Sequence, residues 1–172
     1  MKKAFRLAAL FAILALYFAV APFGYGAFAL LSLVPTRDRV RRARLLQGIM
    51  RRHFTLLHDL MRWSALLDFN ARHIEGELPE GPVVLVANHP GLLDVTALMA
   101  ALPDITTAVK PILYRRRWWR PLLDGARLFP GAADPLDTAH VVDAGCERLQ
   151  EGFRVLIFPE GTRSPQAGLH RF

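Results

Sequence analysis

The hydrophobic and polar positions divide this chain into three parts: an apolar N-terminal segment, a basic helical segment, and a body in which short apolar runs alternate with helical ones. Residues 7–34 are 28 consecutive residues without a charge. A helix of that length would reach roughly 42 Å, more than the ~30 Å hydrocarbon core of a bilayer. The segment is therefore predicted to be a membrane helix.

A break in the middle of this segment leaves two topologies open. Pro22, Gly24 and Gly26 interrupt the apolar run, and basic residues crowd both flanks, at 2–6 and 37–44. The positive-inside rule places the heavier C-terminal cluster in the cytoplasm. If both flanks obey the rule, the segment dips into the membrane and returns. A kinked single span and a re-entrant helix pair both fit this pattern.

A cleaved signal peptide is the main rival to a membrane anchor. The basic start of the chain and the small residues Ala19 and Ala21 resemble a cleavage site. However, Pro22 would follow the cut directly, and the apolar run continues for another 12 residues. The pattern therefore favours an anchor that is not cleaved.

Residues 37–67 have the rhythm of a basic amphipathic helix. Apolar residues recur at intervals of about three to five positions while arginine fills much of the rest: Val40, Leu45, Ile49, Leu56, Leu60 and Trp63. Such a helix beside a membrane segment is expected to attract anionic lipid. His53 and His58 are five positions apart, which does not place them on one helical face, so no metal site is expected there.

From residue 67 onward, predicted strands alternate with predicted helices. The strands are expected at 69–74, 82–87, 106–110 and 153–158, and the helices at 92–102, 118–126 and 138–150, with a loop at 129–136. The runs at 82–87 and 153–158 are continuously apolar, as in buried strands. The fold class is therefore α/β, a sheet flanked by helices. We expect a membrane anchor with its basic helix at 1–66 and the α/β domain at 67–172.

Charge and cysteine content exclude several classes of protein. The net charge is +7, but residues 1–72 carry +9 and residues 73–172 carry −2. Because the basic residues flank an apolar segment and few aromatics accompany them, nucleic-acid binding is not expected. The single cysteine, Cys146, excludes a disulfide framework and a cysteine-based metal site.

Two polar clusters follow the carboxyl ends of predicted strands, where ligands usually bind in open α/β sheets. In the first, a carboxylate at Asp94 on the first helical turn could reach one imidazole nitrogen of His89. The other nitrogen could then take a proton from a hydroxyl group. No serine or cysteine adjoins the pair, so the substrate's own hydroxyl is the natural nucleophile. A helix-capping role for His89 is the structural alternative.

The second cluster, at 160–163, combines a carboxylate, a glycine, a hydroxyl and a guanidinium: Glu160, Gly161, Thr162 and Arg163. Arginine offers a fork for a phosphate, and glycine lets backbone N–H groups approach an anion. An ordinary polar turn after a strand is the alternative reading. The two clusters together, about 70 residues apart, are more specific than either alone.

With both clusters present, the sequence from about Leu67 to the end resembles the lysophospholipid acyltransferase family, the 1-acylglycerol-3-phosphate acyltransferases and their relatives. The segments that carry the resemblance are Asn88 to Asp94 and Phe158 to Ser164. The resemblance implies that His89 is the catalytic base and Asp94 its partner. It also implies a set of substrate-binding residues: Asn88, Lys110, Glu160, Gly161, Thr162 and Arg163.

The activity that the resemblance implies is O-acyl transfer in phospholipid biosynthesis. An acyl thioester, on coenzyme A or acyl carrier protein, would donate a fatty acyl group to the hydroxyl of a lysophospholipid such as 1-acylglycerol-3-phosphate. No metal or organic cofactor is implied. The expected partners are membrane lipids and the thioester donor, and the expected location is the cytoplasmic face of the inner membrane.

The sequence departs from the family pattern in three places. Gly91 stands where many members have serine, and residues 128–134 lack the arginine that usually ends the middle motif. Residues 169–172 read as the start of a further segment, so we expect the domain to be incomplete at its C-terminus. Two alternatives stay open: an acyltransferase of a specialised lipid or polyene pathway, and a catalytically inactive, truncated membrane-associated relative.

Overall fold

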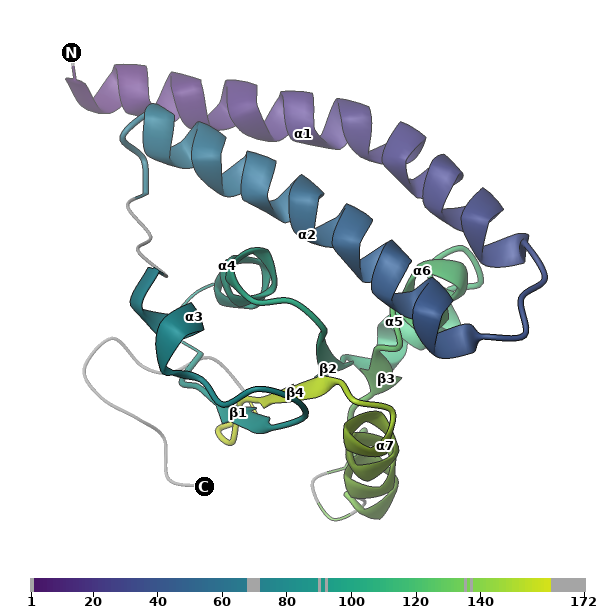
Figure 1. Ribbon diagram of the computed structural model, residues 1–172. Helices are drawn as coiled ribbons and strands as arrows, with labels where there is room; N and C mark the ends of the chain where they lie inside the picture. Colours follow the sequence, from purple (N-terminus) through teal and green to yellow (C-terminus); the bar gives the residue numbers. More distant parts are fainter. Residues whose placement is uncertain are drawn as a thin grey trace.

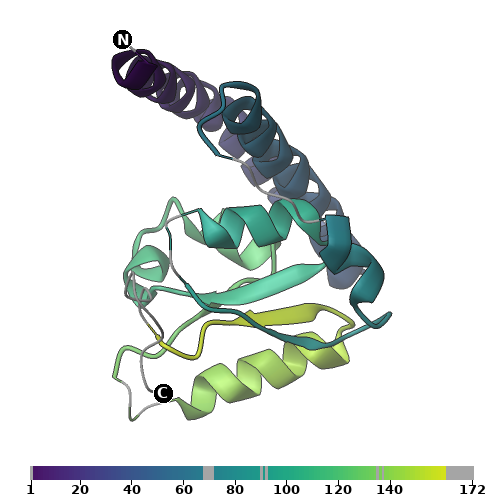
Figure 2. The ribbon, with the colours of Figure 1, turned by 90° about the vertical axis from the view of Figure 1, so that its left-hand side faces the viewer.

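The computed structural model describes residues 2–67, 72–89, 91, 93–134, 136 and 138–161. Its centre is a four-stranded parallel sheet with strand order β1-β4-β2-β3. The strands are β1 (Val84–Val86), β2 (Ile105–Val109), β3 (Phe129–Pro130) and β4 (Arg154–Ile157). Helices α4 (Asp94–Ala101) and α7 (Ala139–Gln150) cover opposite faces of this sheet (Figure 2). The expected α/β class, a sheet flanked by helices, is confirmed.

The two inner strands form the sheet's core because their side chains are apolar or β-branched. In β4, Val155 and Leu156 are buried, and Phe153 just before them is fully buried. In β2, Thr106 and Thr107 are buried, and their hydroxyls donate to the carbonyls of Arg127 and Leu156 at 2.6 and 2.8 Å. Each buried hydroxyl therefore has a partner, which avoids the cost of an unpaired polar group.

Two expectations about strands are wrong. Residues 72–74, expected to be extended, begin helix α3 (Arg72–Glu77); Ile74 and Leu78, four positions apart, both pack against the core, and that is helical spacing. Strand β1, expected to be buried, lies at the edge of the sheet, where the side chains of Val84 and Val86 are 44% and 65% exposed. A continuous apolar run does not distinguish an inner strand from an edge strand.

The other predicted helices match their positions to within a few residues, and two short elements were not predicted. Helix α6 (Arg120–Gly125) and helix α7 fall inside the stretches expected to be helical, and a further short helix, α5 (Pro111–Arg115), follows β2. The loop expected at 129–136 begins instead with β3, whose Phe129 pairs with Ala108 of β2. This two-residue strand is too short to produce a periodic pattern.

The apolar N-terminal segment is one helix. Helix α1 (Lys2–Leu33) continues through Pro22, so the described chain contains a single helix there and not a helix pair. Its stretch Phe5–Leu33 is long and apolar enough to cross a membrane, with a mean hydropathy of 2.2, and is exposed over most of its surface. Exposure on this scale distinguishes it from the core helix of a soluble domain.

Helix α2 (Arg39–Trp63) runs antiparallel to α1 and beside it (Figure 1). The Asp38 carboxylate accepts a hydrogen bond from the backbone N–H of Arg41 at 2.8 Å and so caps the first turn. The Arg42 guanidinium donates to the carbonyls of Ser32 and Val34, which ties α2 to the end of α1. The two helices are thus fixed to each other at this end.

One core joins these helices to the sheet. Phe28 of α1, Leu46 of α2 and Leu123 of α6 belong to the same buried cluster as Leu156 of β4. Helix α2 contributes a buried face that packs on α4: Ala43, Leu46, Gln47, Met50, Leu57, His58 and Met61. A second apolar face of α2 is exposed, with Leu45, Ile49 and Trp63 all at least 40% accessible. The helix expected at 37–67 is confirmed, and it has two apolar faces.

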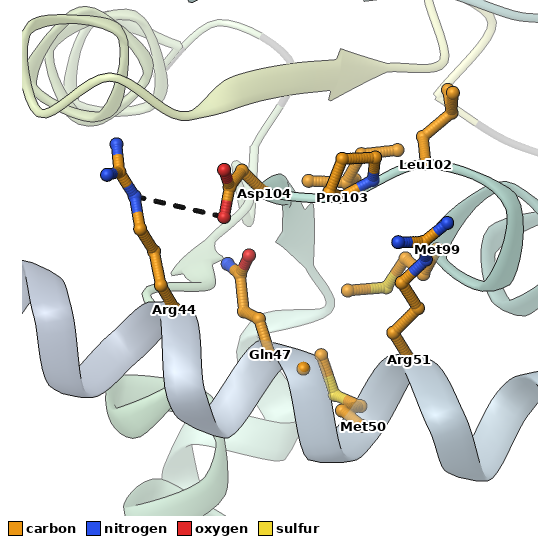
Figure 3. A pocket seen from close by; sticks show the side chains of 10 residues that line it. Arg44, Gln47, Met50, Arg51, Met99, Leu102, Pro103 and Asp104 are labelled. Atoms are coloured by element: carbon orange, nitrogen blue, oxygen red, sulfur yellow. Dashed lines mark ion pairs between the residues drawn. The ribbon is translucent and has the colours of Figure 1, made fainter. Parts of the chain in front are cut away.

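A small pocket of about 90 Å³ separates α2 from the start of β2 (Figure 3). Arg44 Nε lies 3.8 Å from the Asp104 carboxylate across it, and Gln47 Nε2 donates to the Ala126 carbonyl at 2.7 Å. Because Asp104 precedes β2 and the strands are parallel, this pocket lies at the amino edge of the sheet. Both polar clusters follow strand ends and belong to the opposite edge.

Candidate active site

His89 is placed by the end of β1. The last hydrogen bond along this edge joins the N–H of Ala87 to the Ile157 carbonyl at 3.1 Å, and the chain then leaves the sheet. His89 follows two residues later, and Asp94 begins α4. Pro90 and Leu92 lie outside the described residues. The site thus occupies a strand-to-helix turn at the carboxyl edge of a parallel sheet, where ligands bind in such folds.

The His89 imidazole and the Asp94 carboxylate are in contact. His89 Nδ1 lies 3.0 Å from Asp94 Oδ2, and the backbone N–H of Gly91 donates to the same oxygen at 2.6 Å. Both side chains are about three quarters buried, at 23% and 25% exposed. Since a carboxylate only accepts, Nδ1 carries the proton and Nε2 is the nitrogen able to accept one. The contact that the spacing predicts is present.

Phe158, which lies just before the second polar cluster in the sequence, contacts His89. The rings of His89 and Phe158 stack with their centroids 4.5 Å apart and their planes at 30°. Phe158 follows β4, the neighbour of β1, so strand pairing brings together two segments about 70 residues apart. The stack holds the imidazole against the carboxyl end of β4.

A tight turn follows Phe158. The N–H of Gly161 donates to the Phe158 carbonyl at 3.0 Å, with Pro159 and Glu160 between them. Gly161 has a φ of 62°, a left-handed conformation that favours glycine. Glu160 is half-buried in this turn. Thr162 and Arg163, expected to continue the cluster, lie outside the described residues.

The remaining expected residues lie at the same edge. Asn88 is exposed directly before His89, and Lys110 is exposed directly after β2, at the start of α5. Because β4 lies between β1 and β2, Lys110 is two strands away from His89. The described part of the expected site therefore extends along three adjacent strand ends.

Comparison with known proteins assigns this chain to a family. Residues 70–172 match the family model described as Acyltransferase, more than half of the chain. The chain belongs to the acyltransferase family. No curated protein matches the chain at a significant level.

A solved structure shares the fold of this chain. It is the 1-acyl-sn-glycerophosphate (LPA) acyltransferase PlsC from Thermotoga maritima, with 21% sequence identity and a TM-score of 0.60. The match covers 99% of this chain and 66% of the Thermotoga protein, so the chain spans about two thirds of that enzyme's length. The match includes the N-terminal helices as well as the sheet.

Gly91 has a local reason to differ from the serine common in the family. A Cβ atom at this position would lie 3.1 Å from Asp94 Oδ1, tighter than an ordinary contact. A side chain here would require the carboxylate that accepts the His89 Nδ1–H hydrogen bond to shift by a few tenths of an ångström. With glycine, the backbone N–H approaches Asp94 closely and helps to hold it.

His58 of α2 contacts α4, the helix that begins with Asp94. The sequence pattern does not predict this contact. His58 Nε2 lies 3.1 Å from Thr96 Oγ1, and the Thr96 hydroxyl donates to the Leu93 carbonyl at 2.8 Å. Thr96 therefore accepts from His58 and donates at the first turn of α4, beside Asp94. The only sequence signal is that His58 falls on the buried face of α2, three positions from Met61.

Acidification is expected to destabilise the protein through His58. Burial lowers the pKa of His58 from its usual 6.5, an effect that Asp59 partly offsets. Below about pH 6.5, His58 binds a proton more readily in the unfolded chain than in the folded chain. The free energy of unfolding therefore falls as the pH falls through this range. His58→Gln retains a donor for Thr96 but does not titrate. Melting temperatures between pH 7.5 and 5 should fall less in this variant than in the wild type.

His53 limits the size of that difference, because burial also lowers its pKa. The ring of His53 packs against Tyr17 of α1 in a tilted arrangement with centroids 4.5 Å apart. Some acid sensitivity should therefore persist in His58→Gln. An unchanged pH dependence of the melting temperature would show that His58 titrates normally.

Among the described residues, no group of three or more histidine, cysteine, aspartate or glutamate side chains is arranged to hold a metal ion. In the His89–Asp94 pair, the carboxylate oxygen already accepts two hydrogen bonds. The geometry of this pair is that of a base and its orienting carboxylate.

Proposed function

We propose that this chain is an O-acyltransferase that moves a fatty acyl group from a thioester to the hydroxyl of a lysophospholipid such as 1-acylglycerol-3-phosphate, in phospholipid biosynthesis. The donor is an acyl group on coenzyme A or acyl carrier protein. The observation that carries the proposal is the 3.0 Å contact of His89 Nδ1 with Asp94 Oδ2 at the carboxyl edge of an acyltransferase-family sheet. Membership of the family supplies the reaction class.

The reaction needs one base and one nucleophile. In the proposed mechanism, Nε2 of His89 takes the proton of the acceptor hydroxyl as its oxygen attacks the thioester carbonyl. The Asp94 carboxylate stabilises the imidazolium that forms and keeps the ring oriented. The tetrahedral intermediate then collapses, the C–S bond breaks, and the imidazolium returns the proton to the departing thiolate. No electrons are exchanged, so the chemistry requires no redox cofactor.

Recognition of the acceptor's phosphate is assigned to the segment after β4. Glu160 and Gly161 lie in the turn beside His89, and Thr162 and Arg163 follow directly in the sequence. Lys110 and Asn88 add polar groups at the neighbouring strand ends. An arginine fork binds a phosphate with two parallel hydrogen bonds, which suits it to this task.

The proposed location is the cytoplasmic face of the inner membrane. Helix α1 supplies the apolar surface, and the arginines that follow it favour the cytoplasmic side by the positive-inside rule. Membrane lipids are then the immediate surroundings of the site and the source of its acceptor. A thioester donor would approach from the aqueous phase.

Replacing Arg163 tests the assignment of the phosphate. Arg163→Lys keeps the charge but loses the planar fork, so the apparent KM for 1-acylglycerol-3-phosphate should rise while that for the acyl donor changes little. The matching monoacylglycerol, which lacks the phosphate, serves as control acceptor, and its use should be unaffected. A rise confined to the donor's KM would show that Arg163 serves the thioester.

A further inference from the structure

The exposed side of α2 forms a groove with the end of α1. Its volume is about 620 Å³, within the range of roughly 300–1,000 Å³ typical of ligand sites. Leu31 of α1 and Val34, which directly follows α1, line it on one side, and Leu45 and Ile49 of α2 line it on the other. All four side chains are at least 40% exposed. Figure 1 shows α1 and α2 side by side along this region.

The polar part of this groove carries one sign of charge. Its charged lining residues are Arg41, Arg42, Arg44 and Arg52, and none of its lining residues is acidic. Arg42 is engaged with the carbonyls of Ser32 and Val34, and Arg44 lies near Asp104. No hydrogen bond or ion pair with a described residue engages the guanidinium of Arg41 or Arg52. The groove therefore combines apolar walls with uncompensated positive charge.

Gly48 leaves space in the middle of the groove. It lies in the interior of α2, where glycine is the least favourable residue after proline. A Cβ atom at this position would meet nothing within 4 Å, so packing within the described chain does not require glycine. Positions 41, 45, 48 and 52 fall on one face of the helix. The missing side chain thus widens the groove between the two unpaired arginines.

We propose that this groove binds one anionic phospholipid. Its phosphate meets Arg41, whose guanidinium no described residue engages, and its acyl chain lies against Leu45, Ile49 and the end of α1. Charge complementarity selects an anionic headgroup, and the apolar walls beside an uncharged 28-residue segment select a lipid over a soluble phosphate. The site rests on the proposed membrane association but not on acyl transfer, since it lies on α2 and not at the strand ends.

Lipid counting on the whole chain tests this site. The full chain is purified in a nonionic detergent, and bound phospholipid is counted by native mass spectrometry without acyl donor. The probes are phosphatidylglycerol and phosphatidylcholine with the same acyl chains. One phosphatidylglycerol should bind, and phosphatidylcholine should bind more weakly. Arg41→Gln should weaken phosphatidylglycerol binding about five-fold.

Two matched controls distinguish lipid binding in the groove from general electrostatic attraction of an anionic lipid to the basic residues of α2. Arg39→Gln removes the same charge from an exposed position on α2 outside the groove and should change the affinity little. Gly48→Phe should fill the groove and reduce binding, while Gly48→Ala should leave it nearly unchanged. If Gly48→Phe melts at a much lower temperature than the wild type, the comparison of Arg41→Gln with Arg39→Gln decides alone.

Three results would overturn the proposal: equal weakening by Arg41→Gln and Arg39→Gln, equal binding of the two phospholipids, or loss of binding in Arg163→Lys. The last would place the lipid in the acceptor site. Because binding is measured without donor, a chain that transfers no acyl group can still retain the lipid. The experiment therefore distinguishes an absence of lipid binding in the groove from an absence of the proposed acyl-transfer activity.

Discussion

Replacing His89 by alanine should lower kcat by about 10²- to 10⁴-fold, the usual contribution of a positioned general base. Without the imidazole, no described group at this edge is oriented by a carboxylate to take the hydroxyl proton. The His89 side chain lies at the carboxyl edge of the sheet, outside the buried core, and contacts Asp94 and Phe158, so the melting temperature should change little. Steady-state kinetics and thermal melting on the same preparation check both expectations.

A control for His89 is available on the other face of the sheet. His140 is exposed on α7, and His140→Ala should leave kcat close to that of the wild type. The structural alternative, in which His89 only supports the start of α4, expects a lower melting temperature with a modest loss of turnover. A folded His89→Ala variant with near-normal kcat would exclude His89 as the base.

Asp94→Asn should produce the second largest loss, about 10²-fold or more in kcat. Asp94 Oδ2 accepts from two donors, His89 Nδ1–H and the Gly91 N–H. An amide of the same size can present its oxygen to these donors but lacks the charge that stabilises the imidazolium. The KM for the acceptor should stay near the wild-type value, because Asp94 is not assigned to the phosphate.

The combination of the two replacements tests whether the pair acts as a unit. The double variant His89→Ala, Asp94→Asn should lose little more than the worse single variant, because removing the base leaves the carboxylate nothing to orient. Additive losses in the logarithm of kcat would instead mean that Asp94 has a separate function. Melting temperatures of all three variants serve as the control for folding.

The local pattern of residues predicts much of this fold because the α/β body has a strong periodic signal. The apolar run of β4 and the helical spacing of α7 were both recognised within a few residues of their ends. The sequence also predicts that Asp94 can reach His89, because a strand, a turn and a helix start place residues five apart close together, and the structure shows this contact at 3.0 Å. These features depend on neighbours in the sequence.

The features that were missed depend on tertiary neighbours. The pattern of β1 does not reveal that it pairs on one side only, which leaves Val84 and Val86 exposed. The sequence left a single span and a helix pair open at Pro22, and only the structure shows that α1 continues through it as one helix. The contact of His58 with Thr96 requires α2 to pack on α4, an arrangement that no local pattern encodes.

The stacking of His89 on Phe158 illustrates the same limit at the site itself. The two polar segments were paired by their resemblance to a family, but only the parallel pairing of β1 with β4 brings their rings to 4.5 Å. The parallel pairing of β2 with β4 also explains why Lys110, directly after β2, shares this edge. Long-range order of this kind is set by packing of the whole domain.

The most direct test of the central claim is to look for the acylated product. The purified full chain is incubated with a long-chain acyl thioester and 1-acylglycerol-3-phosphate in mixed micelles, and the diacyl product and released thiol are quantified together by mass spectrometry. The proposed mechanism predicts equal amounts of product and thiol, both dependent on the acceptor and both nearly abolished in His89→Ala. Thiol release without diacyl product, or product formation that His89→Ala leaves unchanged, would contradict it.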